Sequence, residues 1–219
     1  MRRATVVLAL LPLGLAACAG RPPVPTASKP IPIIDLPPAK EWEGIAKPAD
    51  QALIAAMPQR WARALAAVPR RRASALRAEG PLMRPDAALE MPTPPPGPYH
   101  CRLVRFGGRA GVTAFKPDFC YVEAKEGKLS FTKQTGSNLP RGWLYEDTPT
   151  REVFLGTMGE GGYGDASAKD VAGVVERVSP FRWRLALTSA GRGALLDVYE
   201  LVPVTPEVPG APRAVPAEG

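Results

Sequence analysis

The residues best able to do chemistry in this chain are three cysteines and a single histidine, His100. A Ser-His-Asp or Cys-His nucleophilic site would have to use His100 as its base. The chain has no Gly-x-Ser-x-Gly motif, and a single histidine excludes most zinc sites. We therefore expect no catalytic residue and no metal site, with His100 facing solvent on a strand or in a loop.

Neither the acidic residues nor the one glycine-rich motif indicates an enzyme or a cofactor. Glu146, Asp147 and Glu152 lack the spacing of a calcium loop. A glycosidase pair would need two acids from distant strands, and nothing in the sequence selects one. Residues 159–164 contain Gly-x-Gly-x-x-Gly, but dinucleotide binding also needs a following helix and an acid about 20 residues later. Ser179 stands there instead, so we predict a flexible hairpin loop and no cofactor.

The first cysteine, Cys18, lies at the end of an N-terminal export signal. Arg2 and Arg3 precede an apolar run at 4–15, which is too short for a membrane span of about 20 residues. The Leu-Ala-Ala-Cys sequence at 15–18 resembles the bacterial lipobox. The resemblance implies cleavage after residue 17 and a lipid on the sulfur of Cys18. An ordinary signal peptide with a chance cysteine is the alternative.

The resemblance to lipoproteins also implies where the mature chain resides. No retention-type Asp follows Cys18, which implies the outer membrane with the protein facing the periplasm. Several acyl chains would anchor it stably. The formal charge is +7, and +5 once Arg2 and Arg3 are removed, which suits anionic lipid or cell-wall surfaces. We expect no nucleic-acid partner, because an exported protein does not meet nucleic acid and no such motif occurs.

The two remaining cysteines, Cys101 and Cys120, form an even pair in an oxidising compartment, which favours a disulfide. A hairpin with its loop at 107–111 would place the two cysteines directly opposite each other. The competing interpretations are two free thiols, or a metal-binding pair together with His100.

Proline-rich segments divide the mature chain. We expect a lipid-anchored, extended tether over 18–47, a second loop over 81–98 and a disordered tail over 204–219. A basic helical segment at 48–80 and a β domain at 99–203 lie between them.

The segment 48–80 shows helical spacing of its apolar residues, at Ile54, Met57, Trp61, Leu65 and Val68. Asp50 is the expected N-cap, and Pro58 must kink or restart the helix. Pro69 is expected to start the last of two or three short helices, and Gly80 to end it. The segment is also basic, with Arg60, Arg63, Arg70, Arg71, Arg72 and Arg77. These arginines form either a solvated face on a packed helix or a patch for lipid head groups or a glycan polymer.

From Tyr99 onward the apolar residues alternate with period two, which indicates strands. The expected strands are 99–106, 114–123, 128–133, 142–146, 152–157, 171–178, 181–188 and 194–202. Phe181, Trp183, Leu185 and Leu187 alternate with polar or small neighbours. We therefore predict an α+β fold, in which short N-terminal helices precede an antiparallel meander that closes into a small, lipocalin-like barrel or a sandwich.

The most distinctive part of the mature chain begins at Phe131 and runs to Thr157. Its polar residues are Lys133, Gln134, Thr135, Ser137 and Asn138. They either line a binding site or form the tip of a hairpin, and Gly and Asn in this stretch favour the turn.

Several short motifs resemble the uncharacterised family named domain of unknown function 4893. They are Tyr-His-Cys-Arg at 99–102, Phe-Cys at 119–120, Phe-x-Lys-x-Thr-Gly-Ser at 131–137, Val-Phe-Leu-Gly-Thr at 153–157 and Tyr-Gly at 163–164. The resemblance spans about 45–203 and implies a β domain with two cysteines, but it brings no activity and no functional residues.

The function expected from these features is that of a non-enzymatic binding or structural module, lipid-anchored in the envelope. Its partner would be an envelope protein or a cell-wall glycan. The alternatives are a lipocalin-like carrier of a small apolar ligand and an inhibitor of an envelope-attacking hydrolase, the latter by analogy of fold alone. A barrel core filled by Trp143, Phe154, Phe181 and Trp183 would argue against the carrier.

Overall fold

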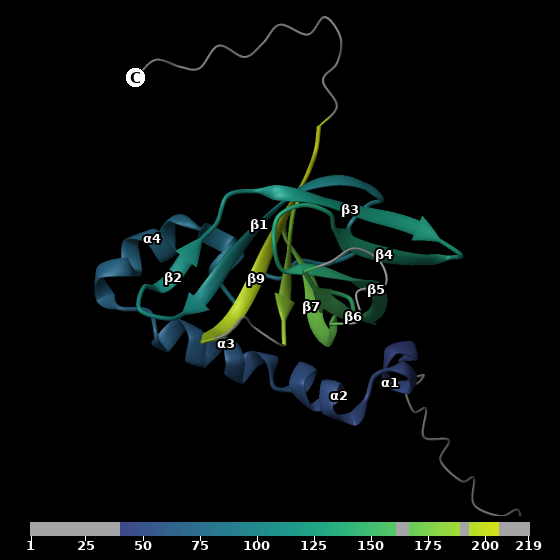
Figure 1. Cartoon of the computed structure of the whole chain (residues 1–219), viewed down its shortest axis with the longest axis horizontal. Helices are drawn as coiled ribbons and strands as arrows, with labels where there is room; N and C mark the ends of the chain where they lie inside the picture. The colour runs from purple at the N-terminus through teal and green to yellow at the C-terminus, as the bar shows by residue number, and fades with distance from the viewer. Residues whose placement is uncertain (1–39, 161–166, 189–192, 206–219) are drawn as a thin grey trace, which may run out of the picture. The chain divides into compact units, whose positions relative to one another are not determined.

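The computed structural model describes residues 40–160, 167–188 and 193–205, which belong to one compact unit starting at Pro38. Cys18 and the predicted signal peptide lie outside the described residues, as do the predicted tether up to residue 39, nearly all of the predicted tail and most of the Gly-x-Gly-x-x-Gly motif. In the described part, short helices come first and nine strands follow (Figure 1). No helix in this part is long and apolar enough to cross a membrane.

The helical segment contains short helices, and most of the breaks between them lie at prolines. The helices are α1 (Glu41–Ile45), α2 (Pro48–Ala55), α3 (Met57–Ala66), the 3₁₀ helix η1 (Arg70–Arg72), α4 (Ala73–Ala78) and the 3₁₀ helix η2 (Gly80–Met83). The restart at Pro58 is confirmed, since Pro58 lies in the first turn of α3, where its missing N–H costs nothing. The N-cap prediction is wrong: Lys47 caps α2 and Asp50 lies in the first turn, because Pro48 starts the helix earlier.

The prediction of a tether up to residue 47 is also wrong at its C-terminal end, where α1 forms. Trp42 is buried, and its indole N–H donates to Asp147 Oδ1 over 3.1 Å. Asp147 also pairs with Lys40 and with Arg151. One buried aromatic ring and one carboxylate therefore attach α1 to the β domain, a contact that local proline content could not reveal.

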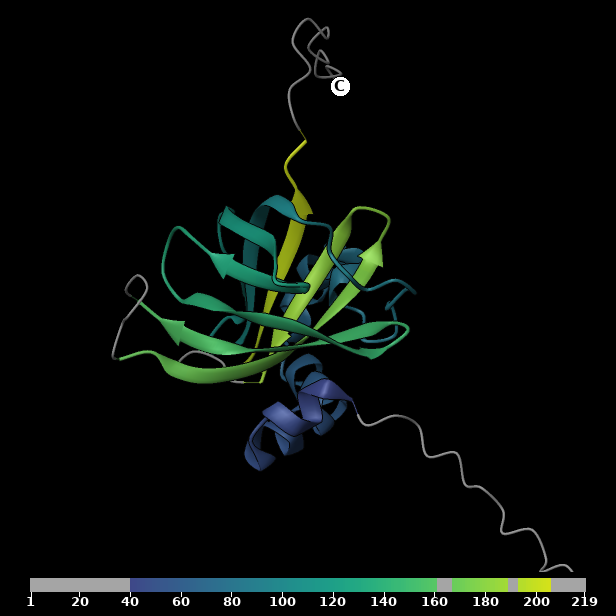
Figure 2. The same cartoon turned by 90° about the vertical axis from the view of Figure 1, so that its right-hand side faces the viewer.

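The strands form an antiparallel meander that closes on itself. They are β1 (Gly97–Gly107), β2 (Gly111–Ala114), β3 (Asp118–Lys125), β4 (Lys128–Lys133), β5 (Leu139–Thr148), β6 (Arg151–Gly159), β7 (Lys169–Ser179), β8 (Arg182–Leu187) and β9 (Ala194–Pro203). Each strand from β3 to β9 pairs with its neighbour, and β9 pairs with β1. Strand β1 pairs on its other edge with β2 and then β3, which together take one position in the barrel, so the nine strands close an eight-stranded barrel. Figure 2 shows the barrel in a second view. The structure thus has the predicted α+β fold with a barrel rather than a sandwich.

The second predicted strand is divided into β2 and β3, with an irregular stretch between them. Val104 pairs with Ala114, and Cys101 pairs with Asp118. Two residues of β1 therefore face three residues of the other strand, 115–117, which form a bulge. The predicted register is wrong, because the hairpin closed by the Gly107–Gly111 pair would by itself place Cys101 opposite Pro117, and the bulge moves its partner only to Asp118. Cys120 therefore lies opposite Tyr99.

The disulfide forms despite this shift. Cys101 and Cys120 are diagonal neighbours with Cα atoms 5.8 Å apart, and both are fully buried. The bond joins β1 to β3 beside the bulge. It therefore covalently ties the interrupted strand to the barrel.

The barrel interior is filled with apolar side chains. Its buried members are Tyr99, Cys101, Leu103, Cys120, Val122, Phe131, Leu144, Phe154, Val171, Val175, Trp183, Leu185, Leu187, Tyr199 and Leu201. Phe154 and Trp183 are in this set as predicted, but Trp143 and Phe181 are not. Trp143 packs on the outer face, against the second core, and Phe181 is 75% exposed in the turn that precedes β8. The predicted alternation includes Phe181, which lies in the turn and not in β8.

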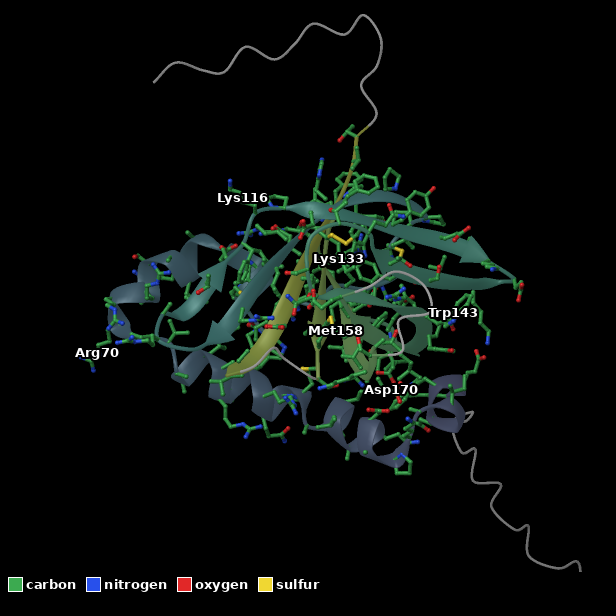
Figure 3. The ribbon with its side chains drawn as sticks, in the orientation of Figure 1. Arg70, Lys116, Lys133, Trp143, Met158 and Asp170 are labelled. Carbon is green, nitrogen blue, oxygen red and sulfur yellow. A yellow bond between two sulfur atoms is a disulfide. The ribbon has the colours of Figure 1, made fainter. Side chains whose placement is uncertain are left out.

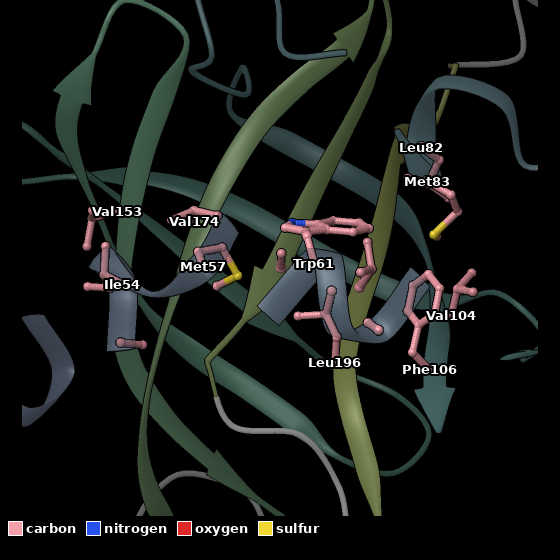
Figure 4. Packing of buried hydrophobic residues seen from close by; sticks show 14 of the residues in the cluster. Ile54, Met57, Trp61, Leu82, Met83, Val104, Phe106, Val153, Val174 and Leu196 are labelled. Atoms are coloured by element: carbon pink, nitrogen blue, oxygen red, sulfur yellow. The ribbon is translucent and has the colours of Figure 1, made fainter. Parts of the chain in front are cut away.

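A second core lies between the barrel's outer face and the helices (Figure 4). Ile54, Met57 and Trp61 are buried there against strand residues such as Val174 and Leu196. The predicted apolar stripe of the helical segment is therefore confirmed. Because α2 and α3 contact β7, β9 and β1, the helices cover part of the outer wall.

Two glycines opposite each other allow strands β5 and β6 to approach closely in the barrel wall. Gly142 on β5 pairs with Gly156 on β6. A Cβ atom on Gly156 would lie 2.1 Å from the carbonyl oxygen of Arg141, and one on Gly142 would lie 2.2 Å from that of Leu155. The two strands can adopt this spacing only without side chains here.

Candidate functional site

The two ends of the barrel differ in how they are closed. Short turns join β3 to β4, β5 to β6 and β7 to β8 at one end, which we call the short-turn end. The segment 89–96 crosses this end. Leu89 N–H donates to Arg177 O over 2.8 Å, and Met91 N–H donates to Pro149 O over 3.0 Å. Pro92 and Pro94 are buried, so this segment closes the short-turn end.

Beneath this segment lies a buried carboxylate that sequence reasoning did not select. Glu152 on β6 is 4% exposed, and its Oε1 accepts a hydrogen bond from the Thr93 hydroxyl. Among the described residues its Oε2 has no hydrogen-bond partner. Burial raises the pKa of Glu152, the Thr93 hydrogen bond opposes this, and the charge of Glu146 adds to the rise. Glu146 is exposed and lies directly opposite on β5.

Replacing Glu152 by glutamine should stabilise the fold at neutral pH by on the order of 1 kcal/mol, because an underpaired buried charge is removed. Since the folded-state pKa is raised, the wild-type penalty is absent below the ordinary glutamate pKa. It grows as pH rises from there through the folded-state pKa. Denaturation of both proteins across this pH range measures the difference. The exposed Glu123→Gln is the control. A Glu152→Gln effect independent of pH would contradict the assignment.

Lys133, which the sequence placed in a candidate polar site, is instead a buried strut at the other end of the barrel, the loop end. Lys133 is 2% exposed, and its Nζ lies 2.7 Å from Asp118 Oδ2 (Figure 3). The same ammonium donates to the carbonyl oxygens of Thr135 and Ser137 over 2.6 and 2.8 Å. Two donors of Lys133 therefore hold the β4–β5 loop in place, and the third links it to Asp118 at the start of β3.

The other members of the predicted polar cluster belong to this same loop. The Thr135 hydroxyl accepts a hydrogen bond from Phe119 N–H over 2.9 Å, and Asn138 has a positive φ of 53°. Gln134, Thr135 and Ser137 are exposed. The structure thus brings the five predicted residues together as a hairpin loop, which matches the turn interpretation. Among the described residues, no contact brings these five side chains together around a shared cavity.

A small open pocket lies at the loop end beside the β1–β2 hairpin. Its volume is about 190 Å³, and Arg105, Arg109, Phe115 and the glycines at 107, 108 and 193 are among its lining residues. Arg105 forms a two-pronged pair with Asp197, with both N–O distances 2.7 Å, and lies over the Phe115 ring. Because Asp197 is 1% exposed and neutralises Arg105, the pocket offers little net charge from that side chain.

The six arginines predicted as a basic surface do not behave alike. Arg63, Arg70, Arg71, Arg72 and Arg77 are exposed, whereas Arg60 is half-buried, with its Nε buried and without a partner among the described residues. Burial, together with the nearby Arg63, lowers the pKa of Arg60. The structure adds Arg109, at the tip of the β1–β2 hairpin, which no periodicity could connect with the helical segment.

The remaining candidates for chemistry are dispersed. His100 is exposed on β1 next to the bonded Cys101. Within the described ranges, no three His, Cys, Asp or Glu side chains are grouped so as to hold a metal ion. Asp147 is committed to Lys40, Arg151 and Trp42, which together lower its pKa although burial acts to raise it.

Comparison with known proteins identifies a family but no activity. The family described as Domain of unknown function (DUF4893) matches residues 42–201. No curated protein and no solved structure matches the chain. The match confirms the family resemblance that the short motifs predict, and the family description names no reaction.

Proposed function

The chain belongs to the family described as Domain of unknown function (DUF4893). We propose that it is a lipid-anchored envelope protein whose folded part is a non-enzymatic binding module. The observation that supports binding at the surface is the packed barrel. Phe131, Phe154 and Trp183 fill its interior, and the 89–96 segment crosses its short-turn end.

This packing disfavours a carrier that encloses an apolar ligand, since such carriers need an apolar cavity of several hundred cubic ångströms. Native mass spectrometry of the purified chain without its lipid is expected to give the mass of the polypeptide alone. A co-purifying apolar molecule would favour the carrier instead.

The anchor is proposed on the sequence around Cys18. Replacing Cys18 by serine should abolish incorporation of labelled fatty acid and release the protein from the membrane fraction, because serine lacks the thiolate that takes the lipid. The matched control is the double variant Cys101→Ser/Cys120→Ser, which should still be labelled. Labelling that persists in Cys18→Ser would contradict the anchor.

The partner of the module is to be found by crosslinking in intact envelopes. The lipid-bearing chain should give a defined crosslinked product, and the soluble chain 19–219 should give the same product when added back. A chain that yields no defined product in either form would count against a binding module.

A further inference from the structure

Six exposed arginines lie on α3, on the helices that follow it and on the β1–β2 hairpin, and we call this set the arginine face. Its members are Arg63 on α3, Arg70, Arg71 and Arg72 on η1, Arg77 on α4 and Arg109 on the β1–β2 hairpin. The two chain segments that supply them, 51–78 and 102–117, contain no Asp or Glu. The face therefore combines a high density of positive charge with an absence of local counter-charges.

Direct contacts hold these two segments together. Arg71 Nη2 donates to Arg109 O over 3.4 Å, and Arg72 Nη2 donates to Val112 O over 3.1 Å. Pro69 packs on Gly111, where a Cβ atom would lie 2.1 Å from the proline Cδ and where φ is +75°. The η1 turn thus rests on the hairpin, and Arg70 projects at the outer edge of the molecule (Figure 3).

The charge of the face is not neutralised within the described part of the chain. Glu79, the first acid after residues 51–78, is bound by Arg102, with an Nη2–Oε2 distance of 2.5 Å. No ion pair joins any of the six arginines to a described carboxylate. Arg60, at the border of the face, has Arg63 as a like-charged neighbour. An external anion would relieve this repulsion.

The distribution of the arginines favours an extended anion over a small one. They come from three consecutive helices and a hairpin tip, and the pocket beside Arg109 holds an Arg105 already neutralised by Asp197. Guanidinium groups bind phosphate oxygens well, and each basic residue near an anionic bilayer contributes about 1 kcal/mol.

We propose that the arginine face binds the phosphate groups of an anionic membrane surface. This rests on the proposed function, because a lipid on Cys18 would keep the folded part within reach of the bilayer. The 19–39 segment can span several tens of ångströms when extended.

The test is co-sedimentation of the lipid-free chain 19–219 with vesicles of phosphatidylcholine alone and of phosphatidylcholine mixed with phosphatidylglycerol. This chain retains the whole compact unit from Pro38. Binding is expected only to the anionic vesicles and should weaken as salt is raised. The variant Arg63→Glu/Arg70→Glu/Arg77→Glu should lose at least about a hundred-fold in partition at low salt, from about five-fold per arginine.

The matched control is Arg84→Glu/Lys125→Glu/Lys169→Glu, which makes the same change in net charge at exposed positions elsewhere. It should keep most of the binding. Equal loss in both variants, equal binding to both vesicle types, or binding to purified cell-wall sacculi in place of vesicles would each overturn the proposal. Failure here with a defined crosslinked partner in envelopes would refute the arginine face and leave the proposed function standing.

Discussion

Replacing Arg184 by methionine should lower the free energy of unfolding by about 3–5 kcal/mol, the cost of removing one partner from a buried ion pair. Arg184 is fully buried on the outer face of β8. Its Nε lies 2.6 Å from Glu176 Oε2, and its guanidinium carbon lies 4.9 Å from the centre of the Trp61 ring. Methionine can cover the Trp61 ring, but it cannot form an ion pair with the Glu176 carboxylate.

The same guanidinium also organises the chain that follows the helices. Nη1 donates to the carbonyl oxygens of Leu82 and Arg84 over 3.2 and 2.6 Å, and Nη2 donates to Pro85 O over 3.1 Å. These acceptors would be left without a donor. We therefore expect faster hydrogen exchange at residues 82–90 in addition to the loss of stability.

Denaturant unfolding followed by tryptophan fluorescence measures the effect. The matched control is Arg182→Met, two residues away on the same face, where the side chain is 24% exposed and pairs with Glu200. That pair should contribute at most about 1 kcal/mol. A loss in Arg184→Met no greater than in Arg182→Met would show that burial of the pair does not matter.

Arg184 illustrates what strand periodicity can and cannot predict. The alternation in β8 correctly places Trp183, Leu185 and Leu187 inside the barrel. It also correctly places Arg184 on the outer face. A charged side chain on an outer face is ordinarily exposed to solvent, so the sequence alone would not predict its burial. Its burial depends on the Trp61 ring and on the backbone of residues 82–85, and no local pattern reports a contact between residues so far apart in the sequence.

The hairpin that carries the disulfide shows a second limit. The pairing of Cys101 with Cys120 was predictable from the even number of cysteines and a compatible spacing. The register was not, because the pairing of Gly107 with Gly111 sets the hairpin three positions away from the one that would make the cysteines face each other, and the bulge at 115–117 makes up only one of the three. The antiparallel meander was predictable from the number of short strands, but the choice between a barrel and a sandwich was not, because the closing pair β1–β9 joins the two ends of the domain.

The candidate sites also contain some features that the sequence reveals and others that depend on the fold. Arg70, Arg71 and Arg72 are evident in the sequence, but their association with Arg109 depends on η1 packing on the hairpin. Lys133 is a charged residue within a polar cluster, which made it a candidate for binding. Its inward direction and the carboxylate of Asp118 make it a structural group instead.

Replacing both Cys101 and Cys120 by alanine should lower the free energy of unfolding by about 3 kcal/mol. The bond links residues 19 apart in sequence, so it restricts the unfolded chain over a loop of moderate length. Both sulfurs are fully buried in the barrel interior, where alanine also leaves unfilled space. The bond joins β1 to β3 beside the bulge, so its loss should loosen this part of the wall first.

Reductant provides the internal check, because it should lower the denaturation midpoint of the wild-type chain and leave that of the double variant unchanged. Cys18→Ser serves as the control, since its midpoint should respond to reductant as the wild type does. Thiol titration of the unfolded, unreduced chain should find neither Cys101 nor Cys120 reactive. A wild-type midpoint insensitive to reductant, with both thiols titrating, would mean that the two cysteines are free and that the barrel is stable without a covalent link between β1 and β3.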